Sequence, residues 1–438
     1  MLIDFERSKE VRIKRANTDW WIHEQSMVGA NGMTYIAYYN DIGEIHVKEL
    51  DAKCSRTPSR DVTLCRLNSN YADEHNSPSI CVMENGTIVV AYTGHAYNHS
   101  IRYRVTQRPF DIMSFGPEQQ LEYSGSVTYA QLSENRKRGE LWLFARVSRV
   151  TWEFRYSADE GKTWSEPHKF LESDAGGLFY FDIHRQLLRS KKRGTYDQWF
   201  FALYGHPRIS ADHTVRSGIF DEDGNLLTMD GEKTGVNLFE SGESGMIDLS
   251  SLDKVYESPE GTTVRLCAVS PLPPYRVGVA SFVLNEPETI TYYSATWREG
   301  KWNLSEPIAK GGEFLSPDTI LDGSQTYVGG MAYYYGVGDA GLSSAKYIAP
   351  TYSDRLYIAR QDGKNRVLEN YVTMDGGRTY QLAQTIRTIP NKYNIKIWRP
   401  VVPIYAQDNL PVYWHEGVYG AHTGGWHSDV VMYVEYDD

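Results

Sequence analysis

Two histidines stand at the two ends of one short apolar segment, where acid–base chemistry would be possible. His75 lies in the turn-forming run 73–78, and His95 closely follows the apolar run 88–92. Side chains in turns at strand ends are free to meet a ligand, and a neutral imidazole can accept a proton near pH 7. The unit 71–95 therefore predicts a functional site. The alternative is that each histidine only hydrogen-bonds its own turn.

A tyrosine and an arginine further along the chain extend this site. Tyr129 lies in a strand-like segment, and Arg146 closes another. A phenol can donate a proton, and a guanidinium can pair with a carboxylate through two hydrogen bonds. If the two residues lie at equivalent strand ends, they converge with the histidines. Two alternatives stay open: Tyr129 is one of 32 tyrosines and could be structural, and Arg146 could pair with Glu153 or Asp159.

Composition indicates an all-β protein. The 438 residues include 32 Tyr and 11 Trp, which favour strands, and 37 Gly, which separate many short apolar runs. A net charge of −11 argues against binding to nucleic acid or to anionic membranes, so an anionic ligand would need a local cationic pocket. The chain has no run of 18 apolar residues and no leader-like start. We expect a secreted or periplasmic protein whose leader has been removed.

A turn motif recurs along the chain. Its clearest copy is 157–164, Ser-Ala-Asp-Glu-Gly-Lys-Thr-Trp, a second is 373–380, and a degraded third spans 293–302. The aspartate accepts turn amides, glycine supplies a positive φ, and the aromatic residue packs between sheets. The motif resembles the Asp box of sialidase-like β-propellers. This resemblance implies a single propeller domain, 1–438, of about seven blades with four antiparallel strands each.

The order of the candidate motifs narrows the resemblance to the propeller polysaccharide lyases that cleave ulvan. It extends from about residue 70 to the C-terminus and rests on this series: Asp73-Glu74-His75-Asn76-Ser77-Pro78, Gly94-His95, Tyr129-Ala130-Gln131-Leu132, a strand ending in Arg146, Tyr204-Gly205-His206-Pro207 and Ile397-Trp398-Arg399-Pro400.

The resemblance implies β-elimination at a 4-linked uronic acid. Arg146 would neutralise the uronate carboxylate, His75 would remove the C5 proton, and Tyr129 would protonate the leaving oxygen. In this family tyrosine can serve as both base and acid. His95 would support the carboxylate side. The partner would be an anionic polysaccharide, bound by a monomer with further contacts from Tyr180, Arg149, Asn76 and Arg208.

A separate group of residues could hold a structural metal. His206 and His213 would lie around one loop, His184 precedes them, and Cys267 would add a soft ligand that suits zinc. Related lyases carry a structural metal, so zinc or calcium is expected, with no catalytic cofactor. The alternative is that His206 caps a turn and Cys267 fills the core.

Two other functions compete with the lyase. The Asp boxes allow a sialidase-like hydrolase, although the usual Arg-Ile-Pro near the first blade is absent. A glycan-binding propeller without catalytic activity would show the same architecture. Near the ends of the chain, we expect the first and last blades to share strands, with 20–22 and 34–39 as closing candidates.

Overall fold

Short antiparallel strands separated by turns make up this protein. The computed structural model describes residues 2–18, 26–51, 59–67, 73–94, 98–173, 179–190, 194–206, 213–271, 273–283, 286–312, 330–334, 355–392, 395–403, 412–418 and 427–435. Their strands form seven separate sheets of four to six strands each. Neighbouring strands within each sheet are antiparallel, as short turns between consecutive strands require.

Each sheet is one blade, and the blades follow one another in chain order. Blade 1 contains β2 (Ala16–Asn17), β3 (Met27–Ala30), β4 (Met33–Asn40), β5 (Glu44–Asp51) and β6 (Asp61–Arg66). Blade 2 contains β7 (Ser79–Val82), β8 (Ile88–Tyr92), β9 (Ser100–Val105) and β10 (Gln119–Glu122). Blade 3 contains β11 (Val127–Asn135), β12 (Glu140–Val147), β13 (Thr151–Ser157) and β14 (His168–Glu172).

The other four blades complete the ring. Blade 4 contains β15 (Phe179–Ser190), β16 (Gly194–Gly205), β17 (Thr214–Asp221), β18 (Asn225–Leu227), β19 (Lys233–Asn237) and β20 (Asp253–Glu257). Blade 5 contains β21 (Thr263–Ser270), β22 (Arg276–Val283), β23 (Glu286–Arg298), β24 (Lys301–Leu304) and β25 (Ala309–Lys310). Blade 6 contains β26 (Gly330–Tyr333), β27 (Arg355–Asp362), β28 (Asn365–Val372) and β29 (Gln381–Pro390). Blade 7 contains β30 (Lys396–Val401), β31 (Tyr413–Val418), β32 (His427–Glu435) and β1 (Ser8–Ile13).

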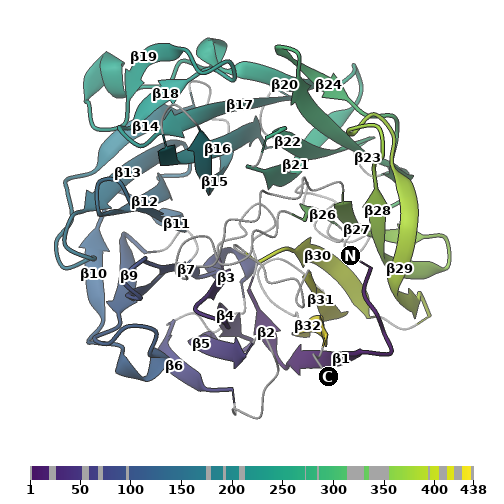
Figure 1. Ribbon diagram of the computed structural model, residues 1–438, viewed down its shortest axis with the longest axis horizontal. Coiled ribbons are helices and arrows are strands. Elements are labelled where there is room, and N and C mark those ends of the chain that lie inside the picture. The colour runs from purple at the N-terminus through teal and green to yellow at the C-terminus, as the bar shows by residue number, and fades with distance from the viewer. Residues whose placement is uncertain are drawn as a thin grey trace.

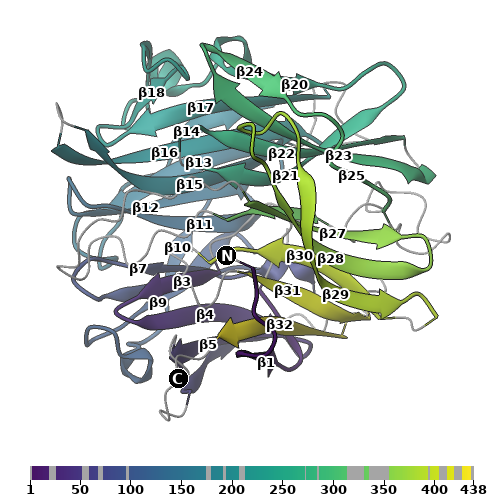
Figure 2. The same ribbon diagram turned by 45° about the vertical axis from the view of Figure 1, so that its right-hand side comes forward.

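The blades surround a common axis, so the protein is a seven-bladed β-propeller, as the sequence predicts (Figure 1). The first strand of each blade lies toward the centre, and Figure 2 shows neighbouring sheets packed face to face. Aromatic rings fill the space between them. Trp142 of blade 3 stacks on Trp199 of blade 4 with ring centres 4.2 Å apart. Large rings suit this position because each can bury both faces between two sheets.

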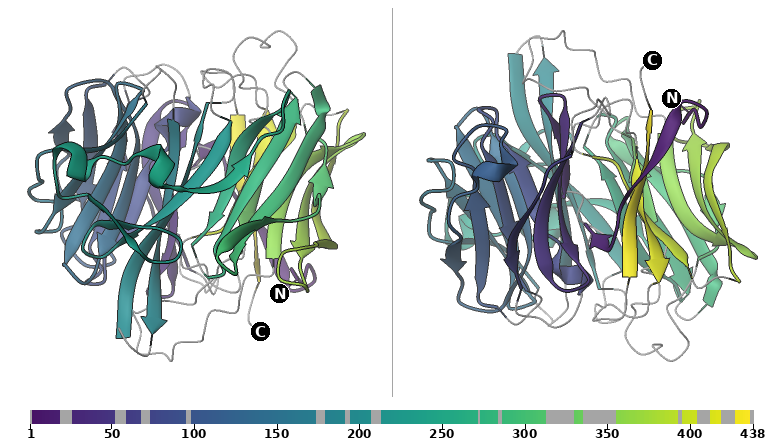
Figure 3. Two further views of the ribbon diagram at one scale, coloured as in Figure 1. Left: turned by 90° about the horizontal axis from the view of Figure 1, so that it is seen from above. Right: turned by 90° about the horizontal axis from the view of Figure 1, so that it is seen from below.

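The ring closes through the N-terminal strand. β1 pairs with β32 from Ser8 opposite Glu435 to Ile13 opposite Val430, so the N-terminal strand forms the outer strand of the last blade. Figure 3 shows this strand beside the C-terminal strands. The expected sharing of strands is confirmed, but the predicted closing segment 34–39 is wrong, because it forms β4 inside blade 1. The other candidate, 20–22, lies outside the described residues.

The two clear Asp boxes are structural turns with the same hydrogen bonds. In the blade 3 box, Asp159 accepts from the Thr163 amide at 2.8 Å and from its hydroxyl at 2.7 Å. In the blade 6 box, Asp375 accepts from the Thr379 amide at 2.9 Å and from its hydroxyl at 2.6 Å. These bonds hold the pKa of both carboxyl groups below the usual range. The boxes therefore stabilise hairpins, as predicted.

Each box also ties its blade to a neighbour. Trp164 packs edge-on against Tyr103 of blade 2, and the Tyr380 hydroxyl donates to Ser294 of blade 5. The degraded third copy differs from these two. Trp297 and Trp302 stand opposite each other in the β23–β24 pair, which is a tight hairpin.

The described helices are four single 3-10 turns: η1 (Glu74–Asn76), η2 (Ile112–Ser114), η3 (Gly242–Gly245) and η4 (Leu249–Ser251). None of them is long or apolar enough to span a membrane. The propeller thus consists of strands, and its candidate functional residues lie where those strands begin and end.

Candidate active site

His75 is fixed by the turn that leads into β7. It lies in η1, whose N-cap is Asp73. One oxygen of the Asp73 carboxylate, Oδ1, accepts from the His75 backbone amide at 3.0 Å and lies 2.5 Å from Nδ1 of the imidazole. Both side chains are buried. The predicted alternative, a histidine bound to its own turn, is therefore partly correct, and this contact also sets the orientation of the ring.

Tyr129 occupies a distorted position at the start of β11. The β11–β12 pairing shifts between Thr128 and Gln131, so Tyr129 and Ala130 form a bulge. Tyr129 has φ +60°, a left-handed conformation that costs a non-glycine residue roughly 1–3 kcal/mol. Bulges redirect side chains and are frequent beside active sites. The ring lies buried, 5.9 Å from the His75 ring and nearly parallel to it.

Arg146 lies on β12, next to Tyr129. Its side chain is 4% exposed, and its Cζ lies 4.4 Å from the centre of the Tyr129 ring and 5.4 Å from that of Tyr180. Its Nε and Nη1 atoms have no hydrogen-bond acceptor among the described residues. An unpaired buried cation is costly, and the two aromatic faces offset only part of that cost.

The predicted alternative partners of Arg146 lie at other positions of blade 3. Glu153 stands opposite Ala145 in the sheet, and Asp159 belongs to the Asp box at the other end of blade 3. Within the described chain, no ion pair links either carboxylate to Arg146. The structural alternative for this arginine is therefore wrong, and its guanidinium remains available to an anion.

Blade 4 completes the cluster with three rings. Tyr180 on β15 lies 6.2 Å from Tyr129, and it also contacts Tyr204 at 5.3 Å and His206 at 5.8 Å, all between ring centres. Trp152 of blade 3 stacks on Tyr129 at 6.4 Å and donates from Nε1 to the carbonyl of Phe179. Three neighbouring blades thus contribute to one group of a histidine, an arginine and several tyrosines.

The remaining predicted contacts have separate placements. Asn76 is buried in η1, where its amide donates to the Asp73 carbonyl at 3.0 Å. Arg149 is exposed in the turn after β12, at the end of blade 3 that carries the site. His95 and Arg208 lie outside the described residues, so their predicted roles stay predictions.

The four predicted metal ligands do not meet. His184 lies four residues beyond Tyr180 on β15, about 13 Å along the strand, and contacts Asp182 at 3.0 Å. His206 contacts Tyr180 instead, and His213 contacts Thr263 at 3.2 Å. Among the described residues, no three His, Cys, Asp or Glu side chains are grouped to hold a metal ion.

Cys267 is a free cysteine on β21 that packs against the hydrophobic core. Burial raises the pKa of its thiol to about 12. The described residues thus give no support to this ligand set, and the metal site stays a prediction. Its residues are widely spaced in the chain, and their spacing could not show on which part of a strand each one lies.

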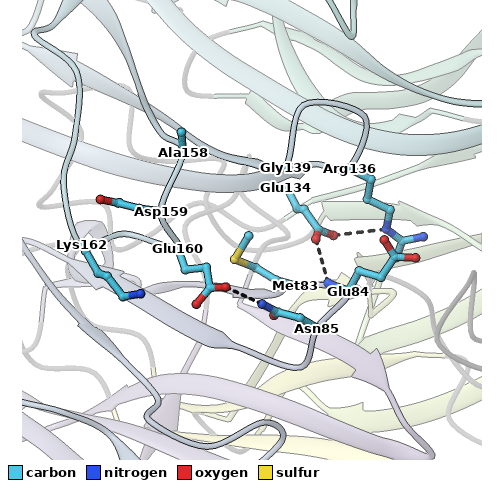
Figure 4. A pocket seen from close by; sticks show the side chains of 10 residues that line it. All are labelled: Met83, Glu84, Asn85, Glu134, Arg136, Gly139, Ala158, Asp159, Glu160 and Lys162. Atoms are coloured by element: carbon cyan, nitrogen blue, oxygen red, sulfur yellow. Dashed lines mark hydrogen bonds and ion pairs between the residues drawn. The ribbon is translucent and has the colours of Figure 1, made fainter.

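A cavity of about 360 Å³ lies at the other ends of the same strands. Figure 4 shows its polar lining: the Glu134 carboxylate accepts from the Glu84 amide and from Arg136, and Asn85 donates to Glu160. Residues 83–85 follow the end of β7, whereas His75 precedes its start. This cavity is therefore distinct from the candidate site, and its polar groups bind one another.

Sequence reasoning overlooked the role of Asp73 and the contact of Trp152. Asp73 stands two residues before a histidine at the start of a turn, which is a detectable capping signal. Trp152 had no signal, because it reaches Tyr129 only through pairing between β12 and β13.

Fold and site together define a seven-bladed β-propeller with a cationic, tyrosine-rich cluster at one end of its inner strands. Comparison with known proteins agrees with this class. A family described as "BNR repeat-containing family member" matches residues 33–196, the part that contains His75, Tyr129, Arg146 and Tyr180.

The chain is similar to ulvan lyases. It is 24% identical over 181 residues to an ulvan lyase of Nonlabens ulvanivorans, covering 34% of this chain and 36% of that protein. It is 25% identical over 115 residues to "Ulvan Lyase-PL25" of Pseudoalteromonas sp. (strain PLSV), covering 23% of each. The matched region thus spans about a third or less of these curated relatives.

A solved structure of a PL25 ulvan lyase superposes with a TM-score of 0.64 at 14% identity, covering 98% of this chain and 96% of that one. A second structure, with 13% identity and the same TM-score, is that enzyme bound to -[GlcA(1-4)Rha3S]-. At this identity the superposition shows the shared propeller fold. The resemblance to ulvan lyases that the motifs indicated is confirmed by these comparisons.

Proposed function

We propose that this protein is a polysaccharide lyase that cleaves a 4-linked uronic acid in ulvan or a related rhamnose-containing anionic polysaccharide. The observation that carries the proposal is the buried Arg146 guanidinium, which stacks on Tyr129 and Tyr180 while two of its nitrogens lack an acceptor among the described residues. A planar cation in this state suits a planar carboxylate. The likeness to ulvan lyases supports a uronate as its source.

The elimination needs three groups. The C5 proton of a uronate is weakly acidic, and it becomes easier to remove once the adjacent carboxylate is neutralised, here by Arg146. His75 accepts that proton, the C4–O bond breaks, and the electron pair forms the C4–C5 double bond. The Tyr129 hydroxyl donates its proton to the departing glycosidic oxygen. The contacts of His75 and of Arg146 with the Tyr129 ring support this assignment.

The remaining site residues are assigned supporting roles. Tyr180 holds the other side of the guanidinium and offers a ring to a sugar face, and His95 supports the carboxylate. The proposed reaction needs no metal or organic cofactor. Because the net charge is −11, attraction of an anionic polymer depends on this local cationic site rather than on the whole surface. Action on such a polymer would place the protein outside the cytoplasm.

The test is ultraviolet absorbance of the conjugated double bond when the protein is incubated with ulvan and, separately, with other uronate polymers. We expect a steady rise with ulvan, and a rise at least about 10²-fold slower with Arg146→Met. New reducing ends without this absorbance would indicate hydrolysis, in which two carboxylates flank the cleaved bond. Binding without cleavage of any polymer would indicate a glycan-binding propeller, and either result would refute the lyase.

A further inference from the structure

We infer that Asp73 is the positioning residue of this site: it keeps His75 protonated at Nδ1, so that Nε2 is the atom that accepts the substrate proton. This inference rests on the proposed function for its catalytic consequence. The structural part, the protonation pattern of His75, stands on the geometry of the turn alone.

The geometry joins one carboxylate oxygen to two groups of the same residue. Asp73 Oδ1 accepts from the His75 amide at 3.0 Å and lies 2.5 Å from His75 Nδ1. An ionised carboxylate can only accept, so the ring must donate from Nδ1. A neutral imidazole carries one proton, and Nε2 is then the basic nitrogen. Asp73 and His75 are 6% and 7% exposed, so little water competes for this bond.

Comparison with two other caps shows that Asp73 does more than begin a turn. Asp111 caps η2 by accepting from the Met113 amide, and Asp248 caps η4 by accepting from the Ser250 amide. In all three turns the bonded amide belongs to the residue two positions later. Only in η1, among these three turns, is that residue a histidine, and its ring shares the oxygen that accepts from the amide.

Hydrogen bonds hold the turn in place, so the His75 ring keeps a fixed orientation in the site. The Asn76 amide donates to the Asp73 carbonyl at 3.0 Å, and the Ser77 hydroxyl donates to the carbonyl of Thr18 in blade 1. The plane of the His75 ring then lies at 26° to that of Tyr129 in blade 3. The carboxylate thus connects a rigid turn to the residue that meets the substrate.

Charge adds a second effect to orientation. When His75 takes the proton from C5, the imidazolium that forms lies beside the Asp73 carboxylate, which stabilises it. In the described structure, the titratable and charged groups that face His75 include Asp73 from its own turn, Tyr129 from β11 and, across the Tyr129 ring, Arg146 from β12. Asp73 therefore favours protonation of the ring, and Arg146 opposes it.

The experiment compares Asp73→Asn with a matched control, Asp248→Asn, in the full chain. Both substitutions remove one charge from a capping aspartate, and asparagine remains a good cap. We would measure kcat and KM for ulvan cleavage from pH 5 to 9. In the same proteins, nitrogen and carbon NMR of the His75 ring would report its tautomer and the midpoint of its titration.

In the wild type we expect a neutral His75 protonated at Nδ1. Asp73→Asn should move both the titration midpoint and the ascending limb of the pH–rate profile to lower pH by about one unit or more, because the protonated ring loses its anion. It should also lower the maximal kcat by about 10²-fold, with KM changed by less than about threefold. Asp248→Asn should change none of these.

Two results would overturn the inference. One is a wild-type ring protonated at Nε2. The other is an Asp73→Asn protein whose ascending limb and titration midpoint stay at the wild-type pH, whatever its stability, since a merely structural cap would not move them. If the wild type cleaves no uronate polymer, the proposed function fails, while the NMR tautomer still decides the role of Asp73.

Discussion

Arg146→Met should make this protein more stable and inactive. In the wild type the guanidinium is buried with two nitrogens unsatisfied by described residues, which costs several kcal/mol of unfolding free energy. Stacking on Tyr129 and Tyr180 stabilises the folded protein by about 0.5–2 kcal/mol for each ring, which offsets part of this cost. Methionine fills similar space without a charge, so we expect a gain of about 1–2 kcal/mol.

The same substitution removes the group that we propose to neutralise the uronate. Loss of one preorganised donor at a developing negative charge lowers the rate by about 10²–10³-fold, which is about 2.7–4 kcal/mol of transition-state stabilisation. Arg146→Lys should fall between methionine and the wild type, because it keeps the charge but loses the planar fork that matches a carboxylate. Activity would be followed by ultraviolet absorbance on ulvan, and stability by urea unfolding with circular dichroism.

Arg155 provides the matched control on the adjacent strand β13. It is also buried and stacks on a tyrosine, Tyr123, but its guanidinium donates to the carbonyls of Ser165 and Glu122. Arg155→Met leaves those acceptors unpaired and should lower stability by about 2–4 kcal/mol. The reasoning is refuted if Arg146→Met destabilises the protein by more than about 1 kcal/mol, or if it retains more than a tenth of wild-type activity.

Three further outcomes follow from other parts of the molecule. Tyr129→Phe should keep the fold within about 0.5 kcal/mol while kcat falls about 10²-fold or more, because the ring contacts remain but the proton donor is lost; retained kcat would assign the acid to another group. Burial, with the nearby charge of Arg399, lowers the pKa of His415 to about 3, so the native protein binds this proton less readily than the unfolded chain, whose value is about 6.5. The contribution of the neutral His415 to the free energy of unfolding is therefore complete above pH 6.5. It is lost as the pH falls toward 3, by about 3 kcal/mol at pH 4. Urea unfolding at pH 7 and pH 4 should show that His415→Gln loses less stability at pH 4 than the wild type does, and an equal loss in the two proteins would contradict this. Glu416 accepts from Arg12 of the closing strand at 2.8 Å and from Arg387 of blade 6 at 2.8 Å. Glu416→Gln should therefore lower the melting temperature and reduce the free energy of unfolding by about 2–4 kcal/mol. An unchanged melting temperature would show that closure of the ring does not depend on these ion pairs.

Local patterns account for the features that could be predicted. The Asp boxes depend on residues within four positions of each other, such as Asp159 and Thr163, so their hydrogen bonds are encoded in the motif itself. The strands follow from short apolar runs between turn residues, and the length of 438 residues at four strands per blade is why about seven blades could be expected. His75, Tyr129 and Arg146 were found by motif order, and the structure brings them together.

Other features depend on contacts between segments far apart in the chain. The closing strand β1 has no stronger apolar pattern than β4, and only its pairing with β32 distinguishes it. Whether the predicted metal ligands lie together depends on tertiary structure in the same way. Residues that could all bind a metal can lie at different positions along their strands. His184 and His206, for example, contact different residues.

The sequence by itself determined the class of fold, the hairpin turns and the types of residue that could perform an elimination, because these depend on local periodicity and local hydrogen bonding. The tertiary structure decided which of those residues meet. A bulge turns Tyr129 toward His75, and sheet pairing places Arg146 beside Tyr129 with no described carboxylate to neutralise it. Burial makes an unpaired charge costly, and that cost is the reason why we propose that Arg146 binds substrate rather than stabilises the fold.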